Sequence, residues 1–305
     1  MEQKIRINRN RWSYDKTDLI IQIIVYLSIL MLSLVILIPC LNVLALSFND
    51  GKDAARGGVY IWPRVFTLAN YKTAFQDGSI MRAYRITIAR TVVGTLMTLI
   101  ATSLTAFVLK ETNLPGRRVI SFLVTFTMLF GGGLIPSYIQ YNRLHLLNSF
   151  WVYVIPGLIS VTHIMMMRTF FETIPYSLQE SAMLDGCGYF GIYWRITMPL
   201  SKSVIAVIAL YSGVSHWNDW FSGAFYMNSD KLWPVQTVLQ QMLARALSAQ
   251  REVSEVSQAL AQTAGVTSDA LKMAAVAITA TPIICIYPFI QKYFTKGVML
   301  GAIKW

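Results

Sequence analysis

Long apolar stretches separated by polar segments dominate the pattern of residues along the chain. About 20 mainly apolar helical residues are needed to cross a bilayer, and six windows meet this length: residues 19–47, 86–109, 119–141, 150–170, 204–225 and 270–290. The pattern therefore predicts an all-α, polytopic membrane protein with six transmembrane helices. The first window is too long for a cleaved secretory signal and lacks a small-x-small cleavage site, so we expect it to stay as an anchor.

Two longer polar segments, residues 172–202 and 226–269, interrupt the second half of this pattern. In the later one, apolar residues between Val235 and Leu247 recur at helical spacing, which predicts an amphipathic helix outside the bilayer. We therefore divide the chain into an N-terminal segment over 1–18, a six-span domain over 19–294 and a C-terminal tail over 295–305.

The composition supports a membrane protein. Of the 305 residues, 55% are hydrophobic and 13% are charged, whereas an average soluble domain is about 25% charged. This balance excludes a disordered chain, a disulfide-built secreted module and an ordinary cytosolic enzyme. Cys40, Cys187 and Cys285 are too far apart for a disulfide framework or a CxxC metal site, and we interpret them as packing residues.

The distribution of positive charge predicts the orientation of the chain. The net charge is +11, and Lys and Arg near the ends of spans favour the cytoplasmic side. With a cytoplasmic N-terminus, 14 of the 26 Lys and Arg residues fall in inside segments and 10 in outside segments. We therefore expect both termini to be cytoplasmic, although the first outer loop is itself basic.

One polar segment, residues 174–203, has an unusual arrangement of helix signals. Ser177 is predicted to cap a short helix, and Asp185 with Gly186 to end it, because glycine adopts the left-handed turn conformation without steric cost. A second helix is expected to run as far as Pro199, which breaks the chain before the fifth window. A short helix that stands off the membrane has no core to fill, so its exposed face indicates contact with a partner.

This segment resembles the EAA loop of the permease subunits of bacterial ABC importers, which has the form EAAxxxDG or EAAxxDG followed by IxLP. The chain carries Glu180, Ser181, Ala182, Asp185 and Gly186, with residues 196–199 matching the later element. Ser181 replaces the second Ala of the motif, and Met198 replaces Leu. The resemblance implies a type I ABC importer permease fold, and it assigns these five residues to coupling with a separate ATPase.

Further stretches resemble the carbohydrate branch of these permeases, similar to the second permease of maltose-type importers and to its complex-oligosaccharide subgroup. They are residues 131–157, 165–175, 216–221 and 287–305. The resemblance implies a location in the bacterial cytoplasmic (inner) membrane. It also implies four kinds of partner besides lipid: a second homologous permease, two ABC ATPase subunits, an extracytoplasmic solute-binding protein and an oligosaccharide.

Motifs for catalysis and cofactor binding are missing from the sequence. No Walker sequence, HExxH or GxSxG occurs, and the three histidines lack zinc-ligand spacing. Gly186, Gly188 and Gly191 match GxGxxG, but without the preceding strand and following acidic residue that dinucleotide binding needs. We expect no enzyme activity, no metal, no cofactor and no nucleic acid bound by this chain, with ATP and magnesium used by the partner ATPase.

A polar and aromatic cluster lies in the outer half of the fifth window and consists of Trp217, Asn218, Asp219 and Trp220. An ionisable residue at membrane depth is costly and usually faces a cavity or a partner, and aromatic faces beside polar acceptors suit a sugar. We predict a substrate path along these residues, with Tyr138 and Tyr141 as further candidates. The alternative is that the Trp residues belong to the interfacial aromatic belt and that Asp219 already lies in water.

Other functions stay open at this point. An ABC permease for a non-sugar solute, such as a polyamine, phosphate or a peptide, carries the same coupling motif. An ion-driven secondary transporter would show inverted repeats or charges in mid-span, and a membrane-embedded enzyme a catalytic pair; we find neither. The first outer loop is basic, with cations at Arg56, Arg64, Lys72, Arg82 and Arg85. Three interpretations of this charge stay open: attraction of an acidic, uronate-type saccharide, docking of an acidic binding protein, or contact with lipid headgroups.

Overall fold

The computed structural model describes residues 16–76, 78–252 and 267–302. Within these ranges the chain forms helices and turns, with one isolated bridge between Asn49 and Phe66 and no strand. The predicted all-α fold is confirmed. Most of the predicted N-terminal segment lies outside the described residues, and the last helix continues through residue 295 into the predicted tail.

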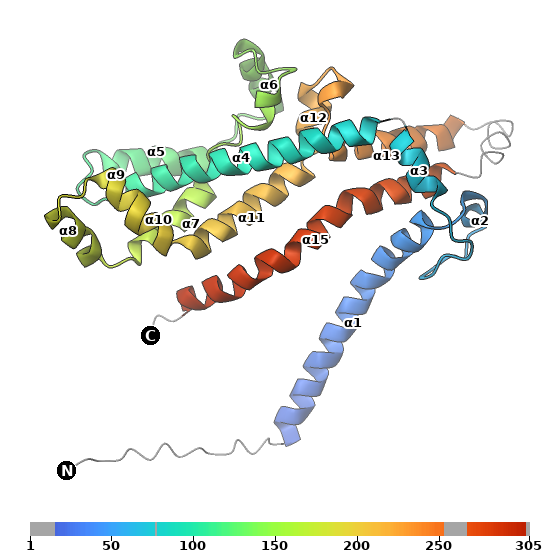
Figure 1. Ribbon diagram of the computed structural model, residues 1–305, viewed down its shortest axis with the longest axis horizontal. Helices are drawn as coiled ribbons and strands as arrows, with labels where there is room; N and C mark the ends of the chain where they lie inside the picture. Colours follow the sequence, from blue (N-terminus) through green and yellow to red (C-terminus); the bar gives the residue numbers. More distant parts are fainter. Residues whose placement is uncertain (1–15, 77, 253–266, 303–305) are drawn as a thin grey trace.

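In the described part of the chain, three helices are long and apolar enough to cross a membrane: α1 (Lys16–Ser47), α4 (Ser79–Lys110) and α15 (Ser268–Ala302). They coincide with the first, second and sixth windows. The helix α4 is the centre of the molecule, because α7 (Val161–Glu172) and α11 (Lys202–Asn218) both pack along it, while α1 diverges from the bundle (Figure 1).

Two further candidate spans are bent pairs of helices. The helices α5 (Arg117–Leu129) and α6 (Leu134–Arg143) meet at 118°, and the segment Tyr189–Leu200 meets α11 at 81°. Counting each pair as one span gives up to five spans in the described part of the chain, so the sixth stays a prediction. The first break falls on three glycines, of which Gly133 has φ +80°, and α6 projects from the bundle (Figure 1).

The predicted fourth transmembrane helix, residues 150–170, was wrong in its first half. Residues 150–160 do not continue α7; they form the 3₁₀ turn η1 (Phe150–Tyr153) and an irregular segment that contains Pro156. Val152, Tyr153 and Val154 are buried and pack with Tyr226 and Met227. These residues are apolar because they fill a core between elements, which a hydropathy window cannot distinguish from lipid contact.

Shorter elements complete the fold. They are α2 (Gly51–Ala55), α3 (Ala69–Gln76), α8 (Tyr176–Leu184), α9 (Tyr189–Ile192), the π-helical turn η2 (Tyr193–Thr197), α10 (Met198–Leu200), α12 (Phe221–Tyr226), η3 (Asp230–Leu232) and α13 (Val235–Glu252). The helix predicted after residue 235 is therefore present, and α13 packs against α15 and α4.

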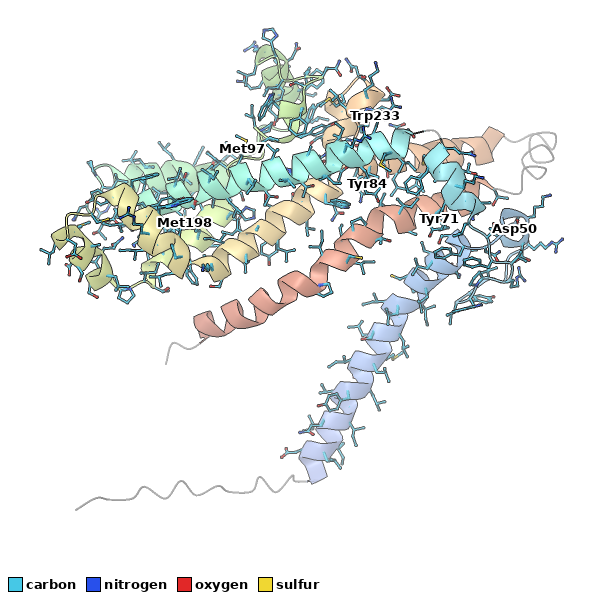
Figure 2. All side chains as sticks on the ribbon, in the orientation of Figure 1. Asp50, Tyr71, Tyr84, Met97, Met198 and Trp233 are labelled. Carbon is cyan, nitrogen blue, oxygen red and sulfur yellow. The ribbon has the colours of Figure 1, made fainter. Side chains whose placement is uncertain are left out.

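Side-chain contacts connect α4, α11 and α15 to one another at one level of the bundle. Tyr84 of α4, labelled in Figure 2, donates a hydrogen bond to the carbonyl of Ile278 in α15. The Tyr84 ring lies 6.2 Å from the ring of Trp217 in α11. The hydrogen bond joins residues 194 positions apart in the chain. Because buried backbone and side-chain polar groups are satisfied in this way, α4, α11 and α15 form one packed unit.

Two helix boundaries differ from the predictions. The helix α8 begins at Tyr176 with Pro175 as its N-cap, so Ser177 lies inside the first turn; proline at a helix start loses no intrahelical hydrogen bond and lets the helix begin earlier. Pro199 lies within α10, and the chain bends after it, at Ser201. The preceding π-helical turn is one of the usual sites where a helix deforms.

Candidate functional site

The short helix α8 stands at one end of the bundle, between α7 and α9 (Figure 1). It ends as predicted: Asp185 is the C-cap, and Gly186 has φ +79°. The Cys187 N–H donates to the Ala182 carbonyl at 2.8 Å, and the Gly186 N–H donates to the Met183 carbonyl at 3.0 Å. This pair of hydrogen bonds is a Schellman motif. Gly186 therefore sets the direction in which the chain leaves α8.

The two sides of α8 have different roles. Gln179 is buried, and Ala182 packs against the core cluster at this end of the bundle. Glu180 and Ser181 are exposed. Leu184, which is 89% exposed, continues this outer surface. A large exposed apolar side chain among polar neighbours is typical of an interaction site.

The segment after α8 fastens it to the membrane-spanning helices. Ile192 is fully buried, and the Tyr193 hydroxyl lies 2.7 Å from the Ser103 hydroxyl of α4. The Tyr193 ring also packs edge-on against Phe107, with centroids 5.4 Å apart. These contacts connect the segment after α8 to α4, which packs along α7 and α11.

A second candidate site lies where α6 and α12 project on the same side of α4 (Figure 1). Ring contacts of 4.2 to 6.2 Å between centroids connect the side chains of the two helices. We call this cluster the aromatic ledge; it consists of Tyr138, Tyr141, Trp220, Phe221, Phe225 and Tyr226. Three predicted path residues, Tyr138, Tyr141 and Trp220, thus belong to one cluster.

Asp219, by contrast, faces into the protein. Its carboxylate Oδ2 lies 2.6 Å from Nη2 of Arg90, a fully buried residue of α4, and Arg90 Nη1 donates to the Asp219 carbonyl at 3.0 Å. The Ser222 N–H donates to Asp219 Oδ1 at 3.1 Å. The Arg90 guanidinium also lies 4.6 Å from the centre of the Tyr153 ring, a cation–π contact. The sequence patterns did not predict this ion pair, and a contact of Asp219 with a substrate stays a prediction.

Of the neighbours of Asp219, Trp217 and His216 also face into the protein, whereas Asn218 is exposed. Trp217 is buried, and its indole Nε1–H donates to the Thr279 carbonyl at 3.2 Å. His216 packs so closely on Gly94 of α4 that a Cβ there would lie 2.4 Å from its Nε2. Asn218 is exposed and accepts a hydrogen bond from Gln236 at 3.5 Å.

Sequence reasoning missed Arg90 and three residues of the aromatic ledge. Phe221 and Phe225 carry a usable signal, because aromatic residues four apart lie on one face of a helix, whereas Tyr226 does not share this spacing. Arg90 is an arginine within an apolar window, which by itself demands a partner. Its partner Asp219 is 129 residues away, and local patterns do not identify such a pair.

One cation of the basic first outer loop, Arg64, makes intramolecular contacts. Arg64 Nε lies 3.0 Å from Asp53 Oδ2, and Arg64 Nη2 donates to the Gly57 carbonyl at 2.6 Å. The hydrogen bond from Asn49, together with Arg64, holds the pKa of Asp53 below its usual value. The four other cations named for this loop are exposed.

Known proteins of similar sequence decide the family. No protein-family model matches the chain. The chain is 34% identical over 281 residues to the polygalacturonan/rhamnogalacturonan transport system permease protein YtcP of Bacillus subtilis (strain 168), which covers 92% of this chain and 97% of that protein. The chain belongs to the permeases of sugar ABC transporters. Protein LplC of the same organism is 36% identical over 268 residues, covering 88% of this permease and 89% of LplC.

The fold of this permease is also that of a solved transporter chain. A chain in the crystal structure of a bacterial ABC transporter involved in the import of the acidic polysaccharide alginate superposes with a TM-score of 0.84. Sequence identity is 28%, and the match covers 92% of this permease and 99% of that chain. The predicted family and type I permease fold are therefore confirmed. Permeases of this kind are membrane transport subunits rather than enzymes, and they bind no cofactor themselves.

Proposed function

We propose that this chain is one of two homologous permease subunits of an ATP-driven oligosaccharide importer in the bacterial cytoplasmic membrane. Two ABC ATPase subunits and an extracytoplasmic solute-binding protein complete the transporter, and both termini of this chain are cytoplasmic. The observation that carries the proposal is the geometry of α8, a short helix whose motif residues Glu180 and Ser181 are exposed and whose end is fixed by the glycine turn at Gly186.

The mechanism follows from how α8 is attached. ATP binding closes the ATPase pair, and α8 moves with it through its exposed residues Glu180, Ser181, Asp185 and Gly186, while Ala182 holds the helix against the core cluster. Tyr193, through its contacts with Ser103 and Phe107, transmits this movement to α4. The bundle then changes between inward-open and outward-open states, each favoured by a different state of the ATPases. ATP and magnesium act in the partner subunits.

The proposed cargo is an acidic oligosaccharide. This is supported by the names of the similar proteins, which specify polygalacturonan, rhamnogalacturonan and alginate. The aromatic ledge on α6 and α12 offers exposed faces at Tyr138 and Trp220, which are 41% and 40% exposed, and aromatic faces pack against the apolar faces of sugar rings. Arg90 is paired with Asp219, so a uronate carboxylate must find its cationic partners elsewhere.

The decisive experiment separates coupling from folding at the α8 turn. In the complete transporter reconstituted into proteoliposomes, Gly186→Arg is expected to lower ATP-dependent oligogalacturonate uptake by about 5- to 150-fold, the range of a lost coupling free energy. The level of the chain in the membrane stays unchanged. Gly188→Ala is the matched control, because Gly188 also has open space around its Cβ position but a φ of −73°; its uptake should match the unmodified protein.

Normal uptake by the Gly186→Arg transporter would contradict the coupling role. Uptake that persists without ATPase subunits under an ion gradient would instead support a secondary transporter. Uptake of a polyamine or peptide, but of no saccharide, would keep the coupling mechanism and replace the proposed cargo.

A further inference from the structure

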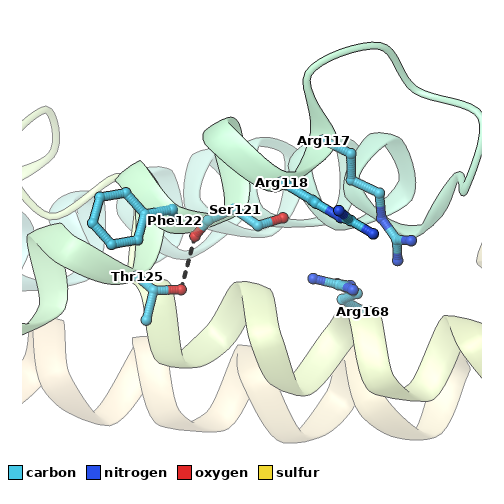
Figure 3. A pocket seen from close by; sticks show the side chains of 6 residues that line it. All are labelled: Arg117, Arg118, Ser121, Phe122, Thr125 and Arg168. Atoms are coloured by element: carbon cyan, nitrogen blue, oxygen red, sulfur yellow. Dashed lines mark hydrogen bonds between the residues drawn. The ribbon is translucent and has the colours of Figure 1, made fainter.

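A cleft of 460 Å³ lies between α5 and α7 at the α8 end of the molecule. It belongs neither to the α8 surface nor to the aromatic ledge. The side chains around it are of two kinds, cationic and largely apolar, and are Arg117, Arg118, Ser121, Phe122, Thr125 and Arg168 (Figure 3).

The cationic end of the cleft has more positive charge than its surroundings neutralise. Arg117 Nη2 and Arg168 Nε both contact Glu172, at 3.5 and 3.0 Å. Arg118 is exposed and has no hydrogen bond or ion pair within the described residues. Figure 3 shows Arg118 and Arg168 facing each other across the cleft. Two guanidinium groups share one carboxylate and the third, that of Arg118, has none in the described part of the chain, which leaves a site that favours an anion with several acceptor oxygens.

The opposite end of the cleft is apolar and has few hydrogen-bonding groups to offer. Phe122 is 65% exposed, and the Thr125 hydroxyl already donates to the Ser121 carbonyl at 2.8 Å. Thr125 is seven residues beyond Arg118, which is about 10 Å further along the axis of α5. A saccharide in this position would lose hydrogen bonds to water without replacing them, whereas a hydrocarbon chain would not.

We propose that the cleft binds an anionic phospholipid, with its phosphate between Arg118 and Arg168 and an acyl chain along Phe122. The order of groups along α5, cationic first and apolar deeper, matches the order of groups along a phospholipid. The cationic end is also at the end of the molecule that carries α8. With the proposed orientation this is the cytoplasmic leaflet, where anionic lipids are abundant and basic pockets between helices bind their headgroups.

The choice of leaflet rests on the proposed function, but the binding itself does not. Lipid binding requires neither ATP nor sugar and is measured separately from transport. A Gly186→Arg transporter that has lost uptake should retain lipid as well as the unmodified transporter does.

The test is native mass spectrometry of the purified complete transporter, titrated with phosphatidylglycerol or phosphatidylcholine. Arg118→Gln breaks no intramolecular ion pair and is expected to weaken phosphatidylglycerol retention about fivefold, the effect of one basic residue near an anionic lipid. Arg143→Gln, at the far end of the α5–α6 pair, is the matched control and should change nothing. Retention of phosphatidylcholine should be weak and equal in all variants.

Three outcomes would overturn the proposal. One is unchanged phosphatidylglycerol retention by Arg118→Gln. Another is displacement of the lipid by inorganic phosphate at comparable concentration, which would indicate a free-anion site. The third is displacement by trigalacturonate, which would assign the cleft to the cargo. Partial recovery of retention by Arg118→Lys would support the proposal, because Lys keeps the charge without the bidentate geometry.

Discussion

The helices α1 and α4 are both 32 residues long and both apolar enough to span a membrane, yet they have opposite environments. No residue in the most apolar window of α1 is buried, whereas 39% of the corresponding window of α4 is buried. In Figure 2 the side chains of α1 project on all sides of the helix. The hydrophobicity of a spanning helix therefore does not tell whether protein surrounds it.

The difference is visible in the residue types. The middle of α1 is almost uniformly Leu, Ile, Val and Met. The buried face of α4 repeats every three or four residues and is built from small and polar side chains, including Thr87, Arg90, Gly94, Thr98 and Thr102. Small residues let helices approach closely in a membrane, and polar ones bond between helices. A stripe of this kind indicates packing inside the bundle, while α1 is left for lipid or another subunit.

The largest effect is expected at the ion pair on the α4 face. Arg90→Ala leaves the carboxylate of Asp219, which is 28% exposed, without its cationic partner, and we expect a cost of about 3 kcal/mol, the lower end of the range for breaking a buried pair. The thermal midpoint of the purified transporter should fall sharply. Replacing both members, in Arg90→Met with Asp219→Asn, should recover much of this loss, because neither charge then lacks a partner. Equal midpoints for Arg90→Ala and the unmodified protein would refute the structural role of the pair.

A pair of isoleucine substitutions tests the comparison directly. Ile164 of α7 is fully buried in the core cluster that includes α4, whereas Ile36 of α1 is 57% exposed. Ile164→Ala should cost about 2–5 kcal/mol through lost burial and a cavity, and Ile36→Ala about 0.5 kcal/mol or less. Denaturant or thermal unfolding in one detergent measures both. A similar cost at Ile36 would mean that another subunit packs tightly on α1.

The close contact between α4 and α11 at Gly94 predicts a smaller loss of stability. Gly94→Ala places a methyl group against His216 and should destabilise the protein by about 1–3 kcal/mol through overpacking. Gly213→Ala is the matched control, since its methyl group would meet Thr95 Oγ1 at an ordinary 3.6 Å. Thermal unfolding of the two variants compares them. If both are equally stable, the α4–α11 contact is looser than the structure indicates.

Much of the fold follows from the sequence where a single unbroken helix fills the apolar window. The first, second and sixth windows coincide with α1, α4 and α15 for this reason. Residues 150–160 did not, because their apolar side chains fill a core around Tyr153. The bend between α5 and α6 falls on a run of three glycines, but the sequence does not predict its angle of 118°.

The candidate sites differ in whether their contacts are local in the sequence. The α8 turn is a local device, so Asp185 and Gly186 could be located from spacing alone. Trp217 and Asp219 were predicted as path residues because their type is unusual in a span, whereas their partners Thr279 and Arg90, on distant helices, could not be predicted from local patterns. Only the folded chain separates them from Trp220, which lies on the aromatic ledge.

The turn at Gly186 selects handedness rather than size. A Cβ added there would meet nothing within 4 Å, so a larger residue has room, yet φ is +79°. An L side chain clashes with its own backbone in that conformation, and asparagine is among the few that tolerate it. Volume-based substitution scales would rank alanine as the mildest exchange at this position, and stereochemistry ranks it below asparagine.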